Sequence, residues 1–302
     1  MIAFWTYIIL FIFGTAAGSF LNVVILRYDP DRLLFSGISG RSHCSSCGRT
    51  LRWYELIPII SFLIQQGRCR SCKARLSFQY PVVELLSGLA FALPLYFLTP
   101  IGSMEIPYIQ VGLWVLMLLI LILISVIDFR LYIIPDGLTI SIGVLAILNF
   151  ILLYTKDSFG ALKEGLYNSS FSSHVALHGS FLGSKASFLF INGNIWFNFM
   201  LGGFLAGIFF AAIYFLSRGR AMGFGDVKLA FVSGLLLGLP DVILSTLLAF
   251  MTGAIYGLIL MALKLKGMKD HVPFGPFIAL GITLVFVFGY DIVDGYFNLF
   301  SF

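Results

Sequence analysis

Seven or eight apolar segments dominate this sequence and restrict it to helical folds embedded in a membrane. They fall at residues 3–25, 82–99, 109–127, 133–154, 195–216, 227–239, 242–263 and 274–292. A helix needs about 20 residues to cross a hydrocarbon core of about 30 Å. The segment 227–239 is shorter, and we interpret it as a helix packed between its neighbours. We therefore expect an all-α polytopic membrane protein with about eight transmembrane helices.

The composition supports this fold class. Hydrophobic residues make up 59% of the 302 residues and charged residues only 11%, whereas soluble domains carry about 25% charged residues. The isoelectric point near 9.0 does not require a nucleic-acid partner, because cytoplasmic basic loops and anionic membrane lipid account for it. No charge precedes Arg27, so the N-terminus lacks the basic region of a cleavable signal peptide.

The basic residues are distributed unevenly between alternate connecting segments. Sixteen of the nineteen Lys and Arg residues lie in 26–81, 128–132, 217–228 and 264–273. The positive-inside rule places these four segments in the cytoplasm and both termini outside. The same assignment places two aspartates, Asp128 and Asp226, on the cytoplasmic side, each at the end of an apolar segment.

The four cysteines form two C-x-x-C pairs, Cys44 with Cys47 and Cys69 with Cys72, separated by 21 residues. This spacing is close to that of four-thiolate zinc sites. We favour zinc, with free thiols and two disulfides as alternatives, because a reducing cytoplasm disfavours disulfides. The zinc would be structural, since four sulfur ligands leave no open position for chemistry. A small Arg-rich segment would need such a metal to fold.

Two aspartates stand where a membrane protein tolerates charge poorly. Asp128 ends the apolar run WVLMLLILILISVID, and Asp226 lies in GFGD before another apolar run. Ionisable residues at such positions are functional candidates by default. The dipole at a helix C-terminus disfavours an anion at Asp128, whereas a helix N-cap is an alternative role for Asp226. If the two meet, they can share a proton and activate a water, as in aspartic proteases.

Other polar residues near these positions have simpler interpretations. Asp136 follows a proline and is expected to cap the next helix in its first turn. Lys228 is either a lysine extending to the membrane surface at a helix end or a ligand for an acidic group on the substrate. His174 and His178 lie four residues apart in the polar segment 155–194, which we interpret as a flexible external loop rather than a metal site.

Six stretches of sequence resemble those of one known family. They are GSFLNVVILR (18–27), HCSSCGRTLRWYELIPIISFL (43–63), GRCRSCKARLSFQYPVVELLSG (67–88), IDFRLYIIPDGLT (127–139), MGFGDVKL (222–229) and VPFGPFIALG (272–281). They are distributed from residue 18 to residue 281 and resemble the bacterial type IV prepilin peptidases, and this resemblance covers nearly the whole chain. These are bifunctional enzymes that combine a leader peptidase with an N-methyltransferase.

The resemblance implies a specific reaction and site. Asp128 and Asp226 would be the catalytic aspartates of a GxGD aspartic protease in the bacterial inner membrane. The substrate would be a prepilin or pseudopilin whose basic leader is cleaved at the cytoplasmic face. The new N-terminus would be methylated by S-adenosylmethionine, and the product would join a type IV pilus or a type II secretion system.

On this basis the chain divides into three parts. We expect a first transmembrane helix at 1–25, a cytoplasmic zinc-binding domain at 26–81 and a transmembrane aspartic peptidase domain at 82–302. The external loop at 155–194 makes the interval between the two aspartates longer than the family pattern.

No recognisable motif in the sequence marks the site that holds the methyl donor. Segment 26–88 is the candidate, and Glu84 is a candidate residue within it. An ion pair between Glu84 and a nearby arginine such as Arg75 is an equally good interpretation. The basic surface of this segment could instead hold lipid headgroups.

Two alternative functions remain at this stage. A proton-coupled transporter could use Asp128 and Asp226 as a relay, but it predicts inverted repeats, which the sequence lacks. A GxGD protease acting on signal peptides would leave the four-cysteine segment unexplained.

Overall fold

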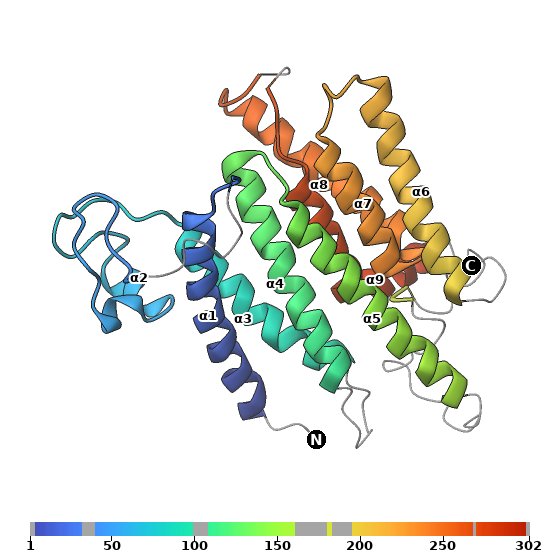
Figure 1. Ribbon diagram of the computed structural model, residues 1–302, viewed down its shortest axis with the longest axis horizontal. Helices are drawn as coiled ribbons and strands as arrows, with labels where there is room; N and C mark the ends of the chain where they lie inside the picture. Colours follow the sequence, from blue (N-terminus) through green and yellow to red (C-terminus); the bar gives the residue numbers. More distant parts are fainter. Residues whose placement is uncertain are drawn as a thin grey trace. The chain divides into compact units, whose positions relative to one another are not determined.

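The structure, a computed structural model, describes residues 4–31, 40–98, 108–160, 180–182, 195–267 and 270–299. Helices make up most of this part of the chain (Figure 1). The long helices are α1 (Phe4–Arg27), α3 (Gln79–Leu98), α4 (Tyr108–Leu131), α5 (Asp136–Gly160), α6 (Ile195–Leu216), α7 (Phe224–Leu237), α8 (Asp241–Ala262) and α9 (Gly275–Leu299). The described residues form two isolated β-bridges but no strand. The prediction of an all-α fold is confirmed.

Six of these helices are long and apolar enough to cross a membrane: α1, α3, α4, α6, α8 and α9. Helix α5 contributes a shorter apolar stretch, Asp136–Leu152. Helix α7 has 14 residues, which span about 21 Å and fall short of a core of about 30 Å. Eight long helices therefore lie in the described chain, but eight crossings are not confirmed.

The chain forms two compact units, Met1–Tyr96 and Phe97–Phe302. The first unit contains α1, most of α3 and, between them, a four-cysteine insert that the structure describes over residues 40–78. The insert carries a short 3₁₀ helix, η1 (Trp53–Leu56), and the short helix α2 (Ile60–Ile64).

Helices α1 and α3 approach each other closely through small residues. Gly14 and Gly18 of α1 are four residues apart and face α3. A Cβ atom on Gly18 would lie 2.7 Å from the Cα atom of Glu84, and one on Gly14 would lie 2.8 Å from that of Gly88. This is the small-xxx-small packing of membrane helices, in which the missing side chains let backbones touch.

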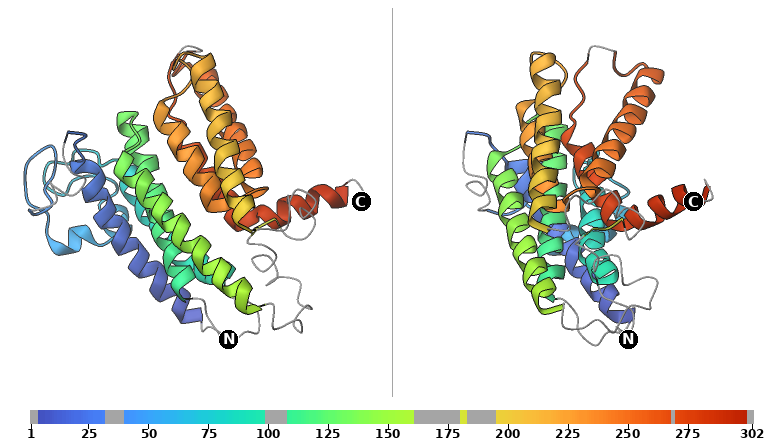
Figure 2. Two further views of the ribbon diagram at one scale, coloured as in Figure 1. Left: turned by 45° about the vertical axis from the view of Figure 1, so that its right-hand side comes forward. Right: turned by 90° about the vertical axis from the view of Figure 1, so that its right-hand side faces the viewer.

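The second unit is a bundle in which α7 occupies an inner position. Helix α7 contacts α5, α6, α8 and α9, and Figure 2 shows α6 and α7 running side by side. A Cβ atom on Gly203 of α6 would lie 2.8 Å from the side chain of Leu235 in α7. The expectation that the short segment packs between its neighbours agrees with these contacts.

Candidate functional site

Helix geometry places both aspartates at helix ends. Asp128 lies in the last turn of α4, where its carbonyl oxygen accepts a 2.9 Å hydrogen bond from the N–H of Tyr132. Tyr132 has a φ of 57°, the left-handed conformation that commonly ends a helix. Asp226 is the third residue of α7, whose N-cap is Gly223.

Each carboxylate accepts one hydrogen bond from a glycine backbone amide. The N–H of Gly275 donates to Asp128 Oδ2 at 3.0 Å, and the N–H of Gly223 donates to Asp226 Oδ2 at 3.0 Å. Gly275 begins α9 and Gly223 caps α7. Both acidic groups therefore face the positive end of a helix dipole, which stabilises negative charge. At Asp128 this contact opposes the unfavourable C-terminal dipole of α4.

The structure brings the two aspartates together in the second unit. The negative charge of Asp128 acts on the carboxyl group of Asp226, and their residues are 4% and 6% exposed. The side chain of Ile134 lies against both glycine neighbours of the pair. A Cβ atom on Gly225 would lie 3.0 Å from Ile134 Cβ, and one on Gly275 would lie 3.1 Å from Ile134 Cδ1.

The pair has the chemical elements of an acid–base centre. Both Oδ2 atoms are fixed by amides, whereas the Oδ1 atoms accept no hydrogen bond within the described part of the chain. Each carboxylate thus keeps one oxygen for a water or a shared proton. Burial also limits competing solvent, so the charge of one group acts strongly on the other.

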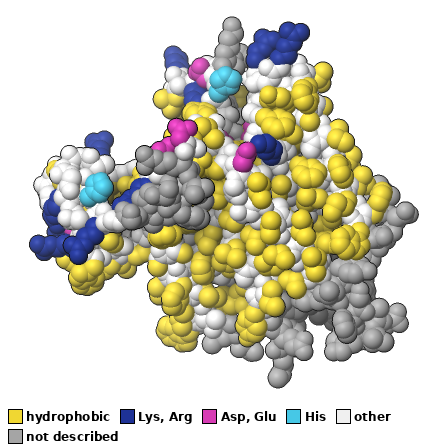
Figure 3. Space-filling model, in the orientation of Figure 1, with side chains coloured by type: hydrophobic (Ala, Val, Ile, Leu, Met, Phe, Trp, Pro, Cys, Tyr) yellow, Lys and Arg dark blue, Asp and Glu magenta, His cyan; other side chains and the backbone are white. Residues whose placement is uncertain are grey.

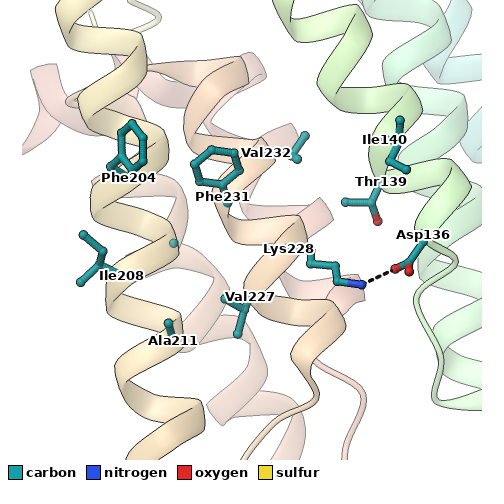
Figure 4. Close-up of a pocket in the computed structure, with 11 residues that line it drawn as sticks. Asp136, Thr139, Ile140, Phe204, Ile208, Ala211, Val227, Lys228, Phe231 and Val232 are labelled. Atoms are coloured by element: carbon teal, nitrogen blue, oxygen red, sulfur yellow. Dashed lines mark hydrogen bonds and ion pairs between the residues drawn. The ribbon is translucent and has the colours of Figure 1, made fainter.

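Asp136 and Lys228 form an ion pair next to this centre rather than inside it. Lys228 Nζ lies 2.8 Å from Asp136 Oδ1, and Asp136 is the first residue of α5, where a cap was expected. The pair lies at a cavity of about 540 Å³ formed by α5, α6 and α7 (Figure 4). Apolar side chains such as Phe204 and Phe231 line most of this cavity, and neither catalytic candidate does.

The four cysteines converge in the first unit. One sulfur atom from each of Cys44, Cys47, Cys69 and Cys72 lies within 4.8 Å of all the others. The Cys44 and Cys72 sulfurs are 3.9 Å apart, close to the spacing of about 3.8 Å that a tetrahedron with Zn–S bonds of about 2.3 Å requires. The residues present therefore fit zinc.

The two cysteine pairs adopt the same backbone geometry. An isolated bridge joins His43 to Thr50 around the first pair, and another joins Arg68 to Arg75 around the second. In each case the residue before the first cysteine pairs with the third residue after the second cysteine. Equivalent loops present their sulfurs in the same way, as two zinc knuckles do. His43 itself is exposed.

Backbone amides favour the thiolate form of one of these cysteines, which is the form that binds a metal cation. The N–H groups of Cys47 and Ser46 lower the pKa of Cys44 to about 6, which favours the thiolate that binds metal. The amide of Ala74 lowers the pKa of Cys72, but burial and the neighbouring thiols raise it to about 11. A divalent ion would favour loss of the remaining thiol protons, because its charge stabilises the thiolates.

Glu84 has partners different from the expected arginine. Its Oε2 atom accepts a 2.7 Å hydrogen bond from the N–H of Ile59, and the carboxylate also accepts one from Ser19. Arg75 makes no contact with it within the described residues. Glu84 is 7% exposed, so it connects α1, α3 and the insert instead of offering a vacant carboxylate.

The sequence did not point to another buried acid, Asp241. Asp241 accepts hydrogen bonds from Ser180 Oγ at 2.5 Å and from the N–H of Phe181 at 2.7 Å. It begins α8, just beyond the far end of α7, and that end lies about 16 Å along α7 from Asp226. Asp241 therefore anchors residues 180–182, the described part of the long loop. His174 and His178 lie outside the described residues.

Models of known protein families match two parts of this chain. Residues 12–98 match the family described as "Bacterial Peptidase A24 N-terminal domain". Residues 174–258 match the "Type IV leader peptidase family", so Asp226 lies inside a matched region and Asp128 lies between the two. No solved structure matches the chain.

Curated relatives extend the match to the whole chain. A protein of Bacillus subtilis named "Prepilin leader peptidase/N-methyltransferase" is 30% identical over 96% of this chain and 98% of its own length. A protein of the same name from Aeromonas salmonicida is 28% identical over 97% of this chain and 94% of its own length. A third, from Myxococcus xanthus, is 48% identical over 28% of this chain and 24% of its own length. With its two acids, its four converging thiols and a relative matched almost from end to end, the chain belongs to the type IV leader peptidase family.

Proposed function

We propose that this protein is a membrane aspartic endopeptidase that removes the basic leader of type IV prepilins or pseudopilins and methylates the new N-terminus. The observation that supports it most directly is the meeting of Asp128 and Asp226, each fixed by a glycine amide at a helix N-terminus. The names of the relatives agree with both activities.

The proposed peptidase mechanism uses the pair as a unit. One carboxylate takes a proton from a water held between the two Oδ1 atoms, and the water oxygen attacks the scissile carbonyl carbon. The other carboxylic acid protonates the leaving nitrogen as the peptide bond breaks. The Gly275 and Gly223 amides keep both groups in place, which lowers the reorganisation needed during the reaction. The pair shares its proton, so neither aspartate has a fixed role before substrate binds.

The remaining parts of the proposal concern the metal and the methyl donor. Cys44, Cys47, Cys69 and Cys72 would hold a structural zinc that stabilises the insert. S-adenosylmethionine would supply the methyl group, with its site in segment 26–88 of the first unit. Glu84 would support that segment through its backbone contact with Ile59.

The proposal also includes an orientation in the bacterial inner membrane. The concentration of basic residues in 26–81 and in the segments next to both aspartates favours the cytoplasmic side. In this arrangement 26–81 is a cytoplasmic domain, 82–302 is the membrane peptidase domain, and cleavage occurs at the cytoplasmic membrane face.

The direct test uses purified protein, a synthetic prepilin and labelled S-adenosylmethionine, with mass analysis of the product N-terminus. Asp128→Asn and Asp226→Asn should each abolish cleavage while the protein still inserts into membranes. Asp136→Asn is the matched control, because its carboxylate is exposed and lies outside the pair. Normal cleavage by either dyad variant would overturn the assigned chemistry. Cleavage without methyl incorporation would overturn the second activity alone.

A further inference from the structure

The starting observation is an acidic residue inside a membrane-spanning helix. Helix α3 has 20 residues and therefore spans about 30 Å, the thickness of a hydrocarbon core. Glu84 is five residues beyond the first residue, Gln79, which puts it about 7 Å below that end of the helix. A carboxylate at this depth is unfavourable unless polar groups partner it.

The partner of this carboxylate is the backbone of the insert. Ile59 donates its N–H to Glu84 Oε2 at 2.7 Å, so the chain at Ile59 lies beside α3 at the depth of Glu84. Ile59 has a φ of 59° and a ψ of −52°, and Ile60 donates to the carbonyl of Pro58. These values describe a tight γ-turn with positive φ, a rare conformation that its surroundings must hold in place. Irregular backbone at membrane depth needs its amides satisfied by protein, and Glu84 does this here.

A second contact fixes the other side of the short helix that follows. Helix α2 contains Phe62, whose ring centroid is 5.4 Å from that of Phe78. Phe78 directly precedes α3, so it lies where that helix leaves the hydrocarbon core. Ile59 lies at the depth of Glu84, inside the hydrocarbon core, and Phe62 lies beside Phe78, where α3 leaves the core. Helix α2 therefore lies at the membrane boundary.

The surface of α2 is too apolar for a location in water. Ile60, Leu63 and Ile64 are 55%, 67% and 75% exposed. The same insert carries seven basic residues and one acidic residue between residues 40 and 78, and the acidic one, Glu55, is paired with Arg49. Figure 3 shows Lys and Arg side chains gathered on the insert next to exposed hydrophobic side chains. An apolar helix beside excess positive charge matches the chemistry of an anionic membrane surface.

We propose that α2 is a re-entrant interfacial segment. Ile60, Leu63 and Ile64 insert among the acyl chains of the leaflet next to the insert, and the surrounding arginines contact anionic phospholipid headgroups. Glu84 is the positioning residue that holds this segment at its depth. The insert is thus attached to the bilayer along one edge, and this attachment does not depend on the proposed catalytic activity.

The test measures depth in a bilayer with the full-length protein. A fluorescent amino acid is introduced at position 64 or, as a control, at position 50, because Thr50 is exposed and lies in the cysteine knuckle. The proteins are placed in nanodiscs of phosphatidylcholine and phosphatidylglycerol whose acyl chains carry bromine, a short-range quencher. We expect strong quenching at position 64 and little at position 50. Equal quenching at both positions, or none at position 64, would overturn the proposal. The apolar surface of α2 would then be a binding surface for another protein.

Variants of Glu84 separate its positioning role from a general loss of folding. Glu84→Ala removes the acceptor for the Ile59 amide, so quenching at position 64 should fall severalfold, whereas Glu84→Gln keeps an acceptor oxygen and should restore it. Retained metal content in both variants shows that the insert is still folded. If Glu84→Ala leaves quenching unchanged while metal content is normal, the positioning role is wrong.

Discussion

At the scale of single residues, the position of a candidate catalytic acid depends on a neighbouring glycine that has no side chain. Gly275 donates its amide to Asp128, and a Cβ atom added at Gly275 would lie 2.7 Å from Asp128 Oδ2. A methyl group and a carboxylate oxygen cannot remain at that distance. The absence of a side chain at this position therefore lets α9 approach the end of α4 closely enough to fix the carboxylate.

This contact predicts the effect of the substitution Gly275→Ala. The new methyl group should displace the Asp128 carboxylate by a substantial fraction of an ångström, and misplacement of about 1 Å can lower a rate about 100-fold. We expect prepilin cleavage to fall by about that factor, measured as initial rates in nanodiscs. Gly295→Ala in the same helix is the control, because a Cβ atom there meets nothing within 4 Å. Equal rates for the two variants would contradict the role of the Gly275 contact.

The sequence identified the two acids but not the groups that hold them. Asp128 and Asp226 were recognisable because charge is rare at the ends of apolar segments. The amide of Gly275 was not recognisable as the partner of Asp128, since it lies 147 residues away and every residue except proline has such a backbone donor. The partner of Glu84 was missed for the same reason, because it is the amide of Ile59 rather than a charged side chain.

At the scale of elements, the apolar pattern predicted every long helix of the described chain to within a few residues at most ends. Two of the remaining differences have local causes. Helix α9 continues to Leu299, past the predicted end at 292, because Asp291 and Asp294 interrupt the apolar run without ending the helix. Helix α7 begins at Phe224, before the predicted start at 227, because its first turn contains glycine and Asp226 rather than apolar residues.

The cysteine knuckles give a prediction about acid. The Cys47 and Ser46 amides lower the pKa of Cys44 to about 6, below that of a free thiol. A lowered thiol pKa favours the thiolate above that value and loses this advantage as the pH falls through it. Zinc should therefore stay bound at neutral pH and leave between about pH 7 and about pH 4, since protons then compete for the sulfur atoms. Metal analysis after dialysis across this range checks the expectation, and uniform zinc content down to about pH 4 would contradict it.

At the scale of the whole molecule, the two sets of candidate site residues belong to different compact units. The four cysteines lie in Met1–Tyr96, and Asp128 and Asp226 lie in Phe97–Phe302. Because each unit has its own internal packing, damage to the insert need not disturb the acid pair. The proposed methyl-transfer site lies in the first unit and the proposed peptidase site in the second, so the two activities should separate.

Cys47→Ser tests this separation. Loss of one thiolate weakens the four-sulfur site, so bound zinc and methyl incorporation should both fall. The cleavage rate per inserted molecule should change much less, because the Asp128 and Asp226 contacts remain. Both products are resolved by mass analysis of one reaction with labelled S-adenosylmethionine, and Ser45→Ala, an exposed change in the same knuckle, is the control. A parallel loss of cleavage and methylation, with normal membrane insertion, would mean that the zinc insert supports the peptidase chemistry directly and that the units do not act independently.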